Sequence, residues 1–107
     1  MKNVIISRGE NISSIEVEGV LLRHPAVQEV AIVGLPHERW GEASHAFVVL
    51  RQGAQTDDAE LREFARANLA HFKAPHRVTF VQELPKTATG KIQKYILRAR
   101  QSAIAAQ

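Results

Sequence analysis

The sequence predicts an α+β domain, in which an N-terminal β-hairpin and a three-stranded core sheet are covered by about three helices. Three observations support this fold class. The length of 107 residues suits one domain. A composition of 45% apolar and 23% charged residues is ordinary for a globular protein. Short β-branched runs alternate with segments of helical period, and their order is hairpin, helix, strand, strand, helix, strand, helix.

The first elements are a hairpin and a capped helix. Residues 4–6 are β-branched and predict a strand, and a polar turn would return the chain to a second strand at Ile12. Ser13 is expected to cap a helix that ends near Arg23, with Glu16 completing a capping box. The side chains expected on the buried side of this helix are Ile15, Val17, Val20, Leu21 and Leu22.

Two central strands are predicted over residues 27–33 and 45–50, because both runs are rich in β-branched side chains. Residues 34–37 are expected to close the first strand, and residues 38–42 to form a polar loop that carries Trp40, the only tryptophan. An indole is costly to leave fully in water. Trp40 is therefore expected either to cap the edge of the core or to form a flat wall for a ligand or a partner domain.

Two further helices are predicted in the second half of the chain. The first begins at Asp57 and ends near Ala70 or His71, and its apolar side chains recur with the helical period. A third core strand is expected over residues 78–81. The last helix is expected to begin near Lys91 and to fray from residue 102. Its apolar side is expected to carry Ile92, Tyr95, Ile96 and Leu97.

The composition excludes several classes of protein. The absence of cysteine excludes a disulfide framework and a thiolate metal site. No apolar run is long enough to predict a membrane span, and no secretory signal is recognisable, so a cytoplasmic location is the default expectation. The net charge of +3 is concentrated in the last third and favours anionic partners such as nucleotides or CoA. Nucleic acid is another anionic candidate, but the few aromatic residues are not interleaved with the basic ones, so a stacking platform for single strands is not supported. No nucleic-acid partner is therefore expected.

The stretch over residues 84–92 (LPKTATGKI) is the strongest candidate site. Pro85 fixes its own φ, and Gly90 allows a turn that a residue with a Cβ would resist. The stretch would then present Lys91 on an ordered loop, where an ammonium suits a phosphate or a carboxylate. The same residues are equally compatible with a surface turn before a helix.

Other site chemistries are not supported. Ile92 stands where a P-loop requires serine or threonine after the lysine. The five histidines are scattered over different elements, with no zinc-hydrolase spacing, and no serine lies in a Gly-x-Ser-x-Gly context. No metal site is therefore expected in this chain.

Residues 84–92 resemble the C-terminal signature of the adenylate-forming enzymes, specifically of the acyl-CoA synthetases. Residues 4–13 resemble the segment just after the interdomain hinge of that family. Further similarities follow in the order and spacing of the family, and they lie at residues 15–18, 24–27, 33–36, 39–42 and 72–75.

The resemblance implies a part of a larger ligase. Residues 1–3 would be a remnant of the hinge, with Lys2 at the hinge position, where aspartate is more frequent. Residues 4–107 would be the mobile C-terminal domain. The N-terminal AMP-binding domain, absent from this chain, would bind ATP with Mg²⁺ and the carboxylic acid, expected to be a fatty acid. The family converts acid and ATP to an acyl-adenylate and pyrophosphate, and the CoA thiol then yields acyl-CoA and AMP.

The resemblance assigns Lys91 to the first half-reaction, in which it would contact the carboxylate and the α-phosphate. Charge moves among those oxygens in the transition state, so a fixed ammonium stabilises it. The resemblance also implies that a lysine acetyltransferase could modify Lys91 and remove its charge. Without the N-terminal domain, the isolated chain is expected to be inactive.

After rotation of the domain, the hairpin with Arg8, Gly9 and Glu10 would face the site for the second half-reaction. Gly9 would let the pantetheine arm of CoA pass close to the backbone. The resemblance places Trp40 near this passage, and Lys73, within residues 72–76, near the nucleotide of CoA.

Three positions depart from the family pattern. Arg8 stands where many relatives have glycine. Ala74 and His76 stand where some relatives carry arginine or lysine for the phosphates of CoA. Lys73 or Arg77 could supply those contacts instead.

Two alternatives stay open. A carrier-protein-loading adenylation domain or a luciferase-like oxygenase shares much of this pattern. A free-standing anion-binding module would also show the basic last third. The chain length of the acid cannot be inferred, because its pocket would belong to the other domain.

Overall fold

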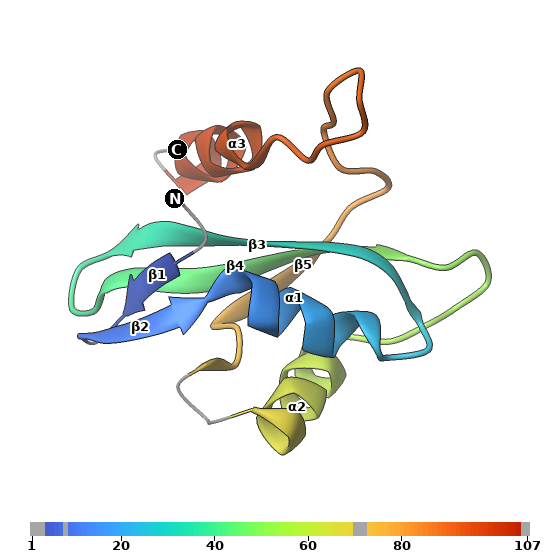
Figure 1. The fold of residues 1–107 in the computed structure, drawn as a ribbon, viewed down its shortest axis with the longest axis horizontal. Coiled ribbons are helices and arrows are strands. Elements are labelled where there is room, and N and C mark those ends of the chain that lie inside the picture. Colours follow the sequence, from blue (N-terminus) through green and yellow to red (C-terminus); the bar gives the residue numbers. More distant parts are fainter. Residues whose placement is uncertain (1–3, 8, 70–72, 106–107) are drawn as a thin grey trace.

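A computed structural model describes residues 4–7, 9–69 and 73–105. The predicted fold class and the order of elements are confirmed (Figure 1). The elements are β1 (Val4–Ser7), β2 (Glu10–Ser13), α1 (Ser14–Leu22), β3 (Val27–His37), β4 (Gly41–Leu50), α2 (Asp58–Asn68), β5 (Arg77–Phe80) and α3 (Lys94–Ala105).

The predicted hairpin and the predicted core strands form one five-stranded sheet. Its main path runs β2-β1-β4-β3, and β5 pairs with β4. All pairs are antiparallel except β4 with β5, which is parallel. The hairpin joins the core through a single register pair between β1 and β4, Ser7 with Gly41. The rest of β1 therefore has little ladder contact with the core strands.

The sheet lies between two helical layers. Figure 1 shows α1 and α2 on one face and α3 on the other. Alternate residues of β3 serve the two faces: Val30 and Ile32 belong to the core under α1 and α2, whereas Val33 packs with Leu84 and Leu97 on the α3 side. Because both faces are covered, β3 and β4 have nearly continuous apolar runs instead of alternation.

The capping prediction for α1 is confirmed in part. The Ser13 hydroxyl accepts the Glu16 N–H at 3.3 Å, and the helix ends at Leu22 with Arg23 as its C-cap. The Glu16 carboxylate, expected to turn back to the cap, contacts the Nζ of Lys73 at 3.1 Å.

The expected buried side of α1 was wrong at two positions. Ile15 and Leu22 are 59% and 47% exposed. They are seven residues apart, about two helical turns, so both lie on the outer face. Their apolar neighbours Val17, Val20 and Leu21 are buried as predicted.

The central strands are longer than predicted. Residues 34–37 continue β3 instead of closing it, since Gly34 pairs with Ser44 and Pro36 with Glu42. The expected loop over residues 38–42 is only a turn at 38–40. Pro36 is tolerated because β3 lies at the edge of the sheet.

The ends of the later elements also differ from prediction. α2 ends at Asn68 with Leu69 extended; the expected ends at Ala70 and His71 lie outside the described residues. β5 ends at Phe80, one residue early, and α3 runs to Ala105 without ending at residue 102.

The start of α3 moves from Lys91 to Lys94, because Ile92 forms a bridge with Lys86 and the Gln93 N–H donates to the Pro85 carbonyl. Within this helix Tyr95 is 65% exposed, which corrects its predicted place on the apolar side.

Candidate functional site

The predicted site stretch forms a small hairpin, here named the lysine loop (residues 84–92). The Thr87 N–H donates to the Lys91 carbonyl at 2.8 Å, and the Gly90 N–H donates to the Thr87 carbonyl at 2.9 Å. Gly90 has a φ of 89°. A turn followed by a glycine in the left-handed conformation is a frequent three-residue hairpin connection. Gly90 takes this left-handed position, which a residue with a Cβ would resist.

The two threonines of the loop add side-chain bonds. The Thr87 hydroxyl accepts the Lys91 N–H at 3.1 Å and lies 2.9 Å from the Thr89 hydroxyl. The backbone of Lys91 is therefore held at both its N–H and its carbonyl by Thr87. All of these hydrogen bonds join residues of the loop itself.

One ion pair attaches the loop to the rest of the domain, and a second attaches the start of α3 just after it. On the side before the loop tip, Lys86 Nζ lies 2.6 Å from Glu29 of β3. On the side after it, Lys94 Nζ lies 2.7 Å from Glu18 of α1. Leu84 is buried beneath the loop in the α3-side core. The first strand of the loop is thus held directly, and the second is followed at once by an anchored helix start.

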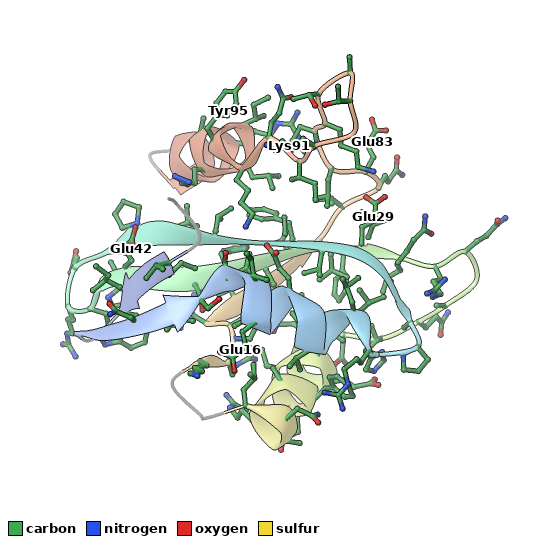
Figure 2. All side chains as sticks on the ribbon, in the orientation of Figure 1. Glu16, Glu29, Glu42, Glu83, Lys91 and Tyr95 are labelled. Atoms are coloured by element: carbon green, nitrogen blue, oxygen red, sulfur yellow. The ribbon has the colours of Figure 1, made fainter. Side chains whose placement is uncertain are left out.

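The Lys91 side chain differs from the other described lysines. Three of the four described lysines lie beside a glutamate: Lys73 with Glu16, Lys86 with Glu29 and Lys94 with Glu18. Among the residues that the structure describes, no carboxylate lies within ion-pair distance of the exposed Lys91 ammonium. Figure 2 shows Lys91 on the α3 side of the sheet. This ammonium is available to an oxyanion from outside the domain.

Two other predicted site residues, Gly9 and Trp40, lie at one end of the sheet. Gly9 forms the tip of the β1–β2 hairpin with a φ of 79°, and no atom lies within 4 Å of the place that a Cβ would take there. The register pair of Ser7 with Gly41 brings this tip beside the turn at residues 38–40. Arg8 and Lys2 lie outside the described residues, and the side chain of Glu10 is not described.

Trp40 lies in an aromatic cluster with two histidines. Its indole stacks on His37 with ring centroids 4.1 Å apart and meets the His76 ring edge-on at 4.9 Å. The N–H groups of Arg39 and Trp40 both donate to His37 Nδ1, so the ring proton of neutral His37 is on Nε2. The indole is half-buried, because one face packs on His37 while part of the ring stays accessible. Its role at the core edge or as a wall for a ligand stays a prediction.

Residues 73–76 lie beside this cluster, as the His76–Trp40 contact shows. Here the Ser44 carbonyl accepts the His76 N–H at 2.9 Å. Lys73 is engaged with Glu16, whereas the exposed Arg77 begins β5. Gly9, His37, Trp40 and His76 are together named the turn cluster, and Figure 1 shows the hairpin and the β3–β4 turn at the end of the sheet away from the lysine loop.

Comparisons with known proteins show the family of the chain. Residues 16–91 match the family described as "AMP-binding enzyme C-terminal domain". The chain belongs to this family. It is 52% identical to a probable CoA ligase of Humulus lupulus over 91% of the chain and 18% of that protein. It is 51% identical to the peroxisomal butyrate–CoA ligase of Arabidopsis thaliana, again over 91% of the chain and 18% of that protein.

Among solved structures, this C-terminal domain superposes on a fatty acyl CoA synthetase of Mycobacterium tuberculosis with a TM-score of 0.89 and 41% identity. The match covers 95% of the chain and 20% of that protein. The chain therefore spans about a fifth of the length of the relatives it matches.

One buried histidine of this C-terminal domain has a shifted pKa. Burial lowers the pKa of His45 to about 4, with smaller contributions in the same direction from Arg77 and His76. The ring nitrogen Nε2 lies 2.7 Å from the Thr79 hydroxyl. His45 is therefore a neutral structural group near neutral pH, behind the segment that carries His76.

Two classes of site are not found in the described parts of the domain. Residues 4–7, 9–69 and 73–105 contain no group of three or more His, Asp or Glu side chains arranged to hold a metal ion. No helix within the same ranges is long and apolar enough to cross a membrane.

The sequence did not indicate which glutamates hold the lysine loop and the β1–β2 hairpin in place. Glu29 and Lys86 are 57 positions apart, and no local pattern links them. Glu42 stood out only as part of a motif, although its carboxylate accepts the Ile6 N–H of the hairpin at 3.0 Å. A pairing of this kind becomes visible only when the register of the strands is known.

Proposed function

We propose that this chain is the C-terminal domain of a carboxylic acid–CoA ligase that works through an acyl-adenylate. Family membership and relatives named CoA ligases support the proposal. Because the chain spans about a fifth of those relatives, an AMP-binding domain would supply the sites for ATP, Mg²⁺ and the acid.

In the proposed first half-reaction, Lys91 contacts the substrate carboxylate and the α-phosphate of ATP. The observation that carries this role is an exposed ammonium, without a carboxylate partner among the described residues, on a loop whose backbone is fixed by Thr87. An ammonium held before the reaction needs no reorganisation when charge moves between the oxygens of the two substrates. A flexible lysine, or one already paired with glutamate, would lose much of this advantage.

In the proposed second half-reaction, the turn cluster and the hairpin face the active site. Gly9, with its positive φ and open surroundings, suits close passage of the pantetheine arm. Arg8 and Glu10 are proposed to line the same passage, with Trp40 beside it. Lys73 is less suited to a phosphate of CoA, because Glu16 is its partner, and the exposed Arg77 is the better candidate.

The acid is proposed to be a fatty acid, as the name of the Mycobacterium tuberculosis relative suggests. The Arabidopsis relative is named for butyrate, so the proposal includes short chains. A panel of straight-chain and aromatic acids given to an intact ligase containing this chain would test it, and a strict preference for aromatic acids would reject it. A cytoplasmic location stays a proposal, since the same Arabidopsis protein is named as peroxisomal.

The decisive test separates the two half-reactions in an intact ligase that carries this domain. Lys91→Ala should lower ATP–pyrophosphate exchange about a hundredfold or more, because the ammonium acts in the transition state of adenylation. Thioester formation from supplied acyl-adenylate should change far less. Arg66→Ala, which removes an exposed cation on α2, is the matched control and should leave both rates near wild type. Wild-type exchange in the Lys91 variant would refute the proposal.

Lys91 is also proposed as a target of a lysine acetyltransferase. Its exposure makes it accessible, and loss of its charge would block the first half-reaction. Quantitative mass spectrometry of the intact ligase, combined with pyrophosphate exchange, tests this point. An enzyme fully acetylated at Lys91 and yet fully active would contradict it.

A further inference from the structure

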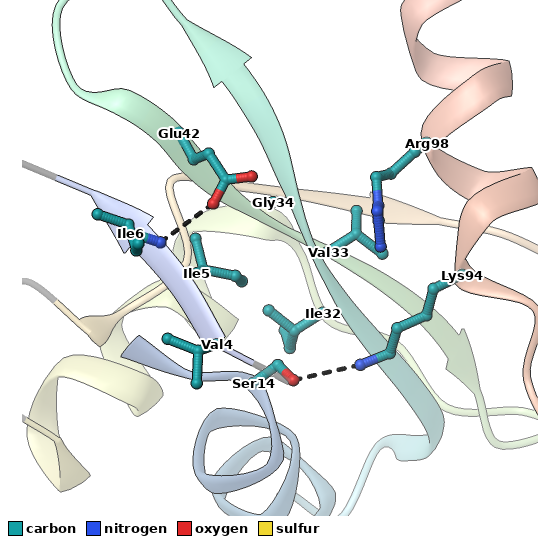
Figure 3. A pocket seen from close by; sticks show the side chains of 10 residues that line it. All are labelled: Val4, Ile5, Ile6, Ser14, Ile32, Val33, Gly34, Glu42, Lys94 and Arg98. Atoms are coloured by element: carbon teal, nitrogen blue, oxygen red, sulfur yellow. Dashed lines mark hydrogen bonds between the residues drawn. The ribbon is translucent and has the colours of Figure 1, made fainter. Parts of the chain in front are cut away.

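The β1–β2 hairpin is weakly attached to the sheet on its β4 side. Beyond the pair of Ser7 with Gly41, β1 leaves β4, and a cavity of about 330 Å³ opens between β1, β3 and α3. Figure 3 shows β1 along one side of this cavity and the side chains of α3 along the other. The packing of Ile5 and Ile12 into the core holds one face of the hairpin, but it does not replace the missing ladder.

A side chain supplies the bond that the ladder lacks. The Ile6 N–H points away from β2 and donates to Oε1 of Glu42 at 3.0 Å, as Figure 3 shows. Glu42 lies on β4, one residue after Gly41. Its carboxylate therefore continues the attachment of β1 to β4 beyond the point where the two backbones separate. A carboxylate acceptor makes this a charge-assisted hydrogen bond, which is stronger than a neutral one.

Gly34 of β3 makes room for this carboxylate. A Cβ at Gly34 would lie 3.0 Å from both Cδ and Oε2 of Glu42 and 3.1 Å from Oε1. Real Cβ contacts are rarely so close, so a side chain at residue 34 would push the carboxylate away from Ile6. Three of the sequence similarities, at residues 4–13, 33–36 and 39–42, thus meet in one contact.

We infer that Glu42, seated on Gly34, is a positioning residue for the CoA step, which it serves by holding the hairpin that carries Gly9. The inference rests on the proposed function, because it assumes that the hairpin lines the path of CoA. A two-stranded hairpin is at best marginally stable in water, so its placement depends on such attachments. Glu42 itself contacts the hairpin backbone and is not assigned any contact with CoA.

The kinetic test uses an intact ligase that carries this domain. Glu42→Ala should lower kcat/KM for CoA about tenfold, mainly through a higher KM, because one charge-assisted hydrogen bond no longer orders the hairpin. ATP–pyrophosphate exchange should stay near wild type. Glu42→Gln should recover most of the loss, since the amide oxygen can still accept the Ile6 N–H. Failure of Gln to rescue would overturn the role assigned to this hydrogen bond.

Gly34 provides an independent variant. Gly34→Ala should raise the KM for CoA several-fold when Glu42 is present, because the new methyl group displaces the carboxylate. In the Glu42→Ala background the same change should add little, since the crowded group is gone. A double-mutant cycle measures this coupling directly. Additive effects of the two substitutions would contradict the proposal that Gly34 makes room for the Glu42 carboxylate.

A structural readout in the 107-residue chain completes the test. Glu42→Ala should increase the hydrogen-exchange rate of the Ile6 amide about tenfold, while amides of β3 and β4 stay protected. Glu63→Ala, which removes an exposed carboxylate on α2, is the matched control and should change neither readout. Unchanged exchange at Ile6 would overturn the inference even if CoA kinetics changed.

The outcomes also separate this inference from the proposed function. If Lys91→Ala spares pyrophosphate exchange, the proposed function fails. If Lys91→Ala abolishes exchange but Glu42→Ala leaves KM for CoA unchanged, only the role of Glu42 fails.

Discussion

At the scale of single residues, Gly90 shows why the lysine loop requires glycine. Its φ of 89° is costly for a residue with a Cβ, although no atom lies within 4 Å of the place a Cβ would take. Gly90→Ala should therefore destabilise the domain by about 1 kcal/mol through backbone strain alone. Gly90→Asn should cost less, because asparagine tolerates the left-handed region. Urea unfolding of both variants checks this, and equal losses would point to a steric cause instead.

Because of His45, the stability of the domain is expected to depend on pH. Its pKa in the folded protein is about 4, below the 6.5 of the unfolded chain, so the fold favours the neutral ring. Above pH 6.5 both states are neutral. As the pH falls from 6.5 towards 4, only the unfolded chain gains a proton here, and stability should fall by up to about 3 kcal/mol. The groups around the ring are Arg77, His76, Asp58 and Thr79.

Urea unfolding at pH 7.5 and pH 5 measures this effect. His45→Gln is the control, because its side chain does not titrate, and its stability should vary less over the same interval. A wild-type curve parallel to that of His45→Gln would mean that the ring is protonated in the folded state.

The residue scale also shows what the sequence could predict of the site. Lys91 stood out because proline, threonine and glycine surround it in a pattern that makes an ordered turn. The sequence could not predict that Lys91, alone among the described lysines, has no carboxylate beside it, because the glutamates that occupy Lys73 and Lys86 are each 57 positions away. Pairings between distant elements depend on packing, which local patterns do not encode.

At the scale of elements, Glu18 joins the two helical layers around the open edge of β3. Its Oε2 accepts the Ile32 N–H of that edge at 2.9 Å and lies 2.7 Å from Lys94 of α3. Glu18→Ala should destabilise the domain by about 1–3 kcal/mol, because it leaves a strand N–H and a half-buried ammonium without this acceptor. Glu18→Gln should cost less, since it can still accept the Ile32 N–H.

Thermal unfolding of these two variants tests the role of Glu18, with Glu63→Ala as an exposed control on α2. Equal melting temperatures for wild type and Glu18→Ala would exclude a stabilising role of Glu18. In the intact ligase, the same variant should slow adenylation more than CoA transfer, because Lys94 closely follows the lysine loop.

The bounds of helices were predictable where a neighbouring side chain caps the helix. Ser13 caps α1 as its position indicated, and α2 begins one residue after the expected Asp57, which is its N-cap. The start of α3 was misplaced because helical period alone cannot show that Ile92 pairs back with Lys86. The ends of β3 and β4 were missed for a similar reason: strand pairing carries Gly34 and Pro36 through residues that usually form turns.

At the scale of the whole molecule, the domain has its own two-sided core but spans only about a fifth of the length of its relatives. Under the proposed function, the sites for ATP and the acid belong to another domain. The 107-residue chain should therefore fold cooperatively yet release no AMP from ATP, fatty acid and CoA. Calorimetry of the pure chain, followed by an AMP assay with an intact ligase as the positive control, checks both parts. Turnover by the isolated chain would overturn the proposed dependence on a second domain.

The three-layer core determines when the lysine loop and the turn cluster can each reach an active site. The lysine loop and the turn cluster are carried by opposite ends of one packed sheet, and a close-packed interior does not bend to bring them together. Under the proposed function, a single active site can meet them only in succession, so the whole domain must rotate through solvent between the two chemical steps. Friction with that solvent then enters the catalytic cycle: added sucrose or glycerol should slow overall turnover while leaving the equilibrium for acyl-adenylate formation in place.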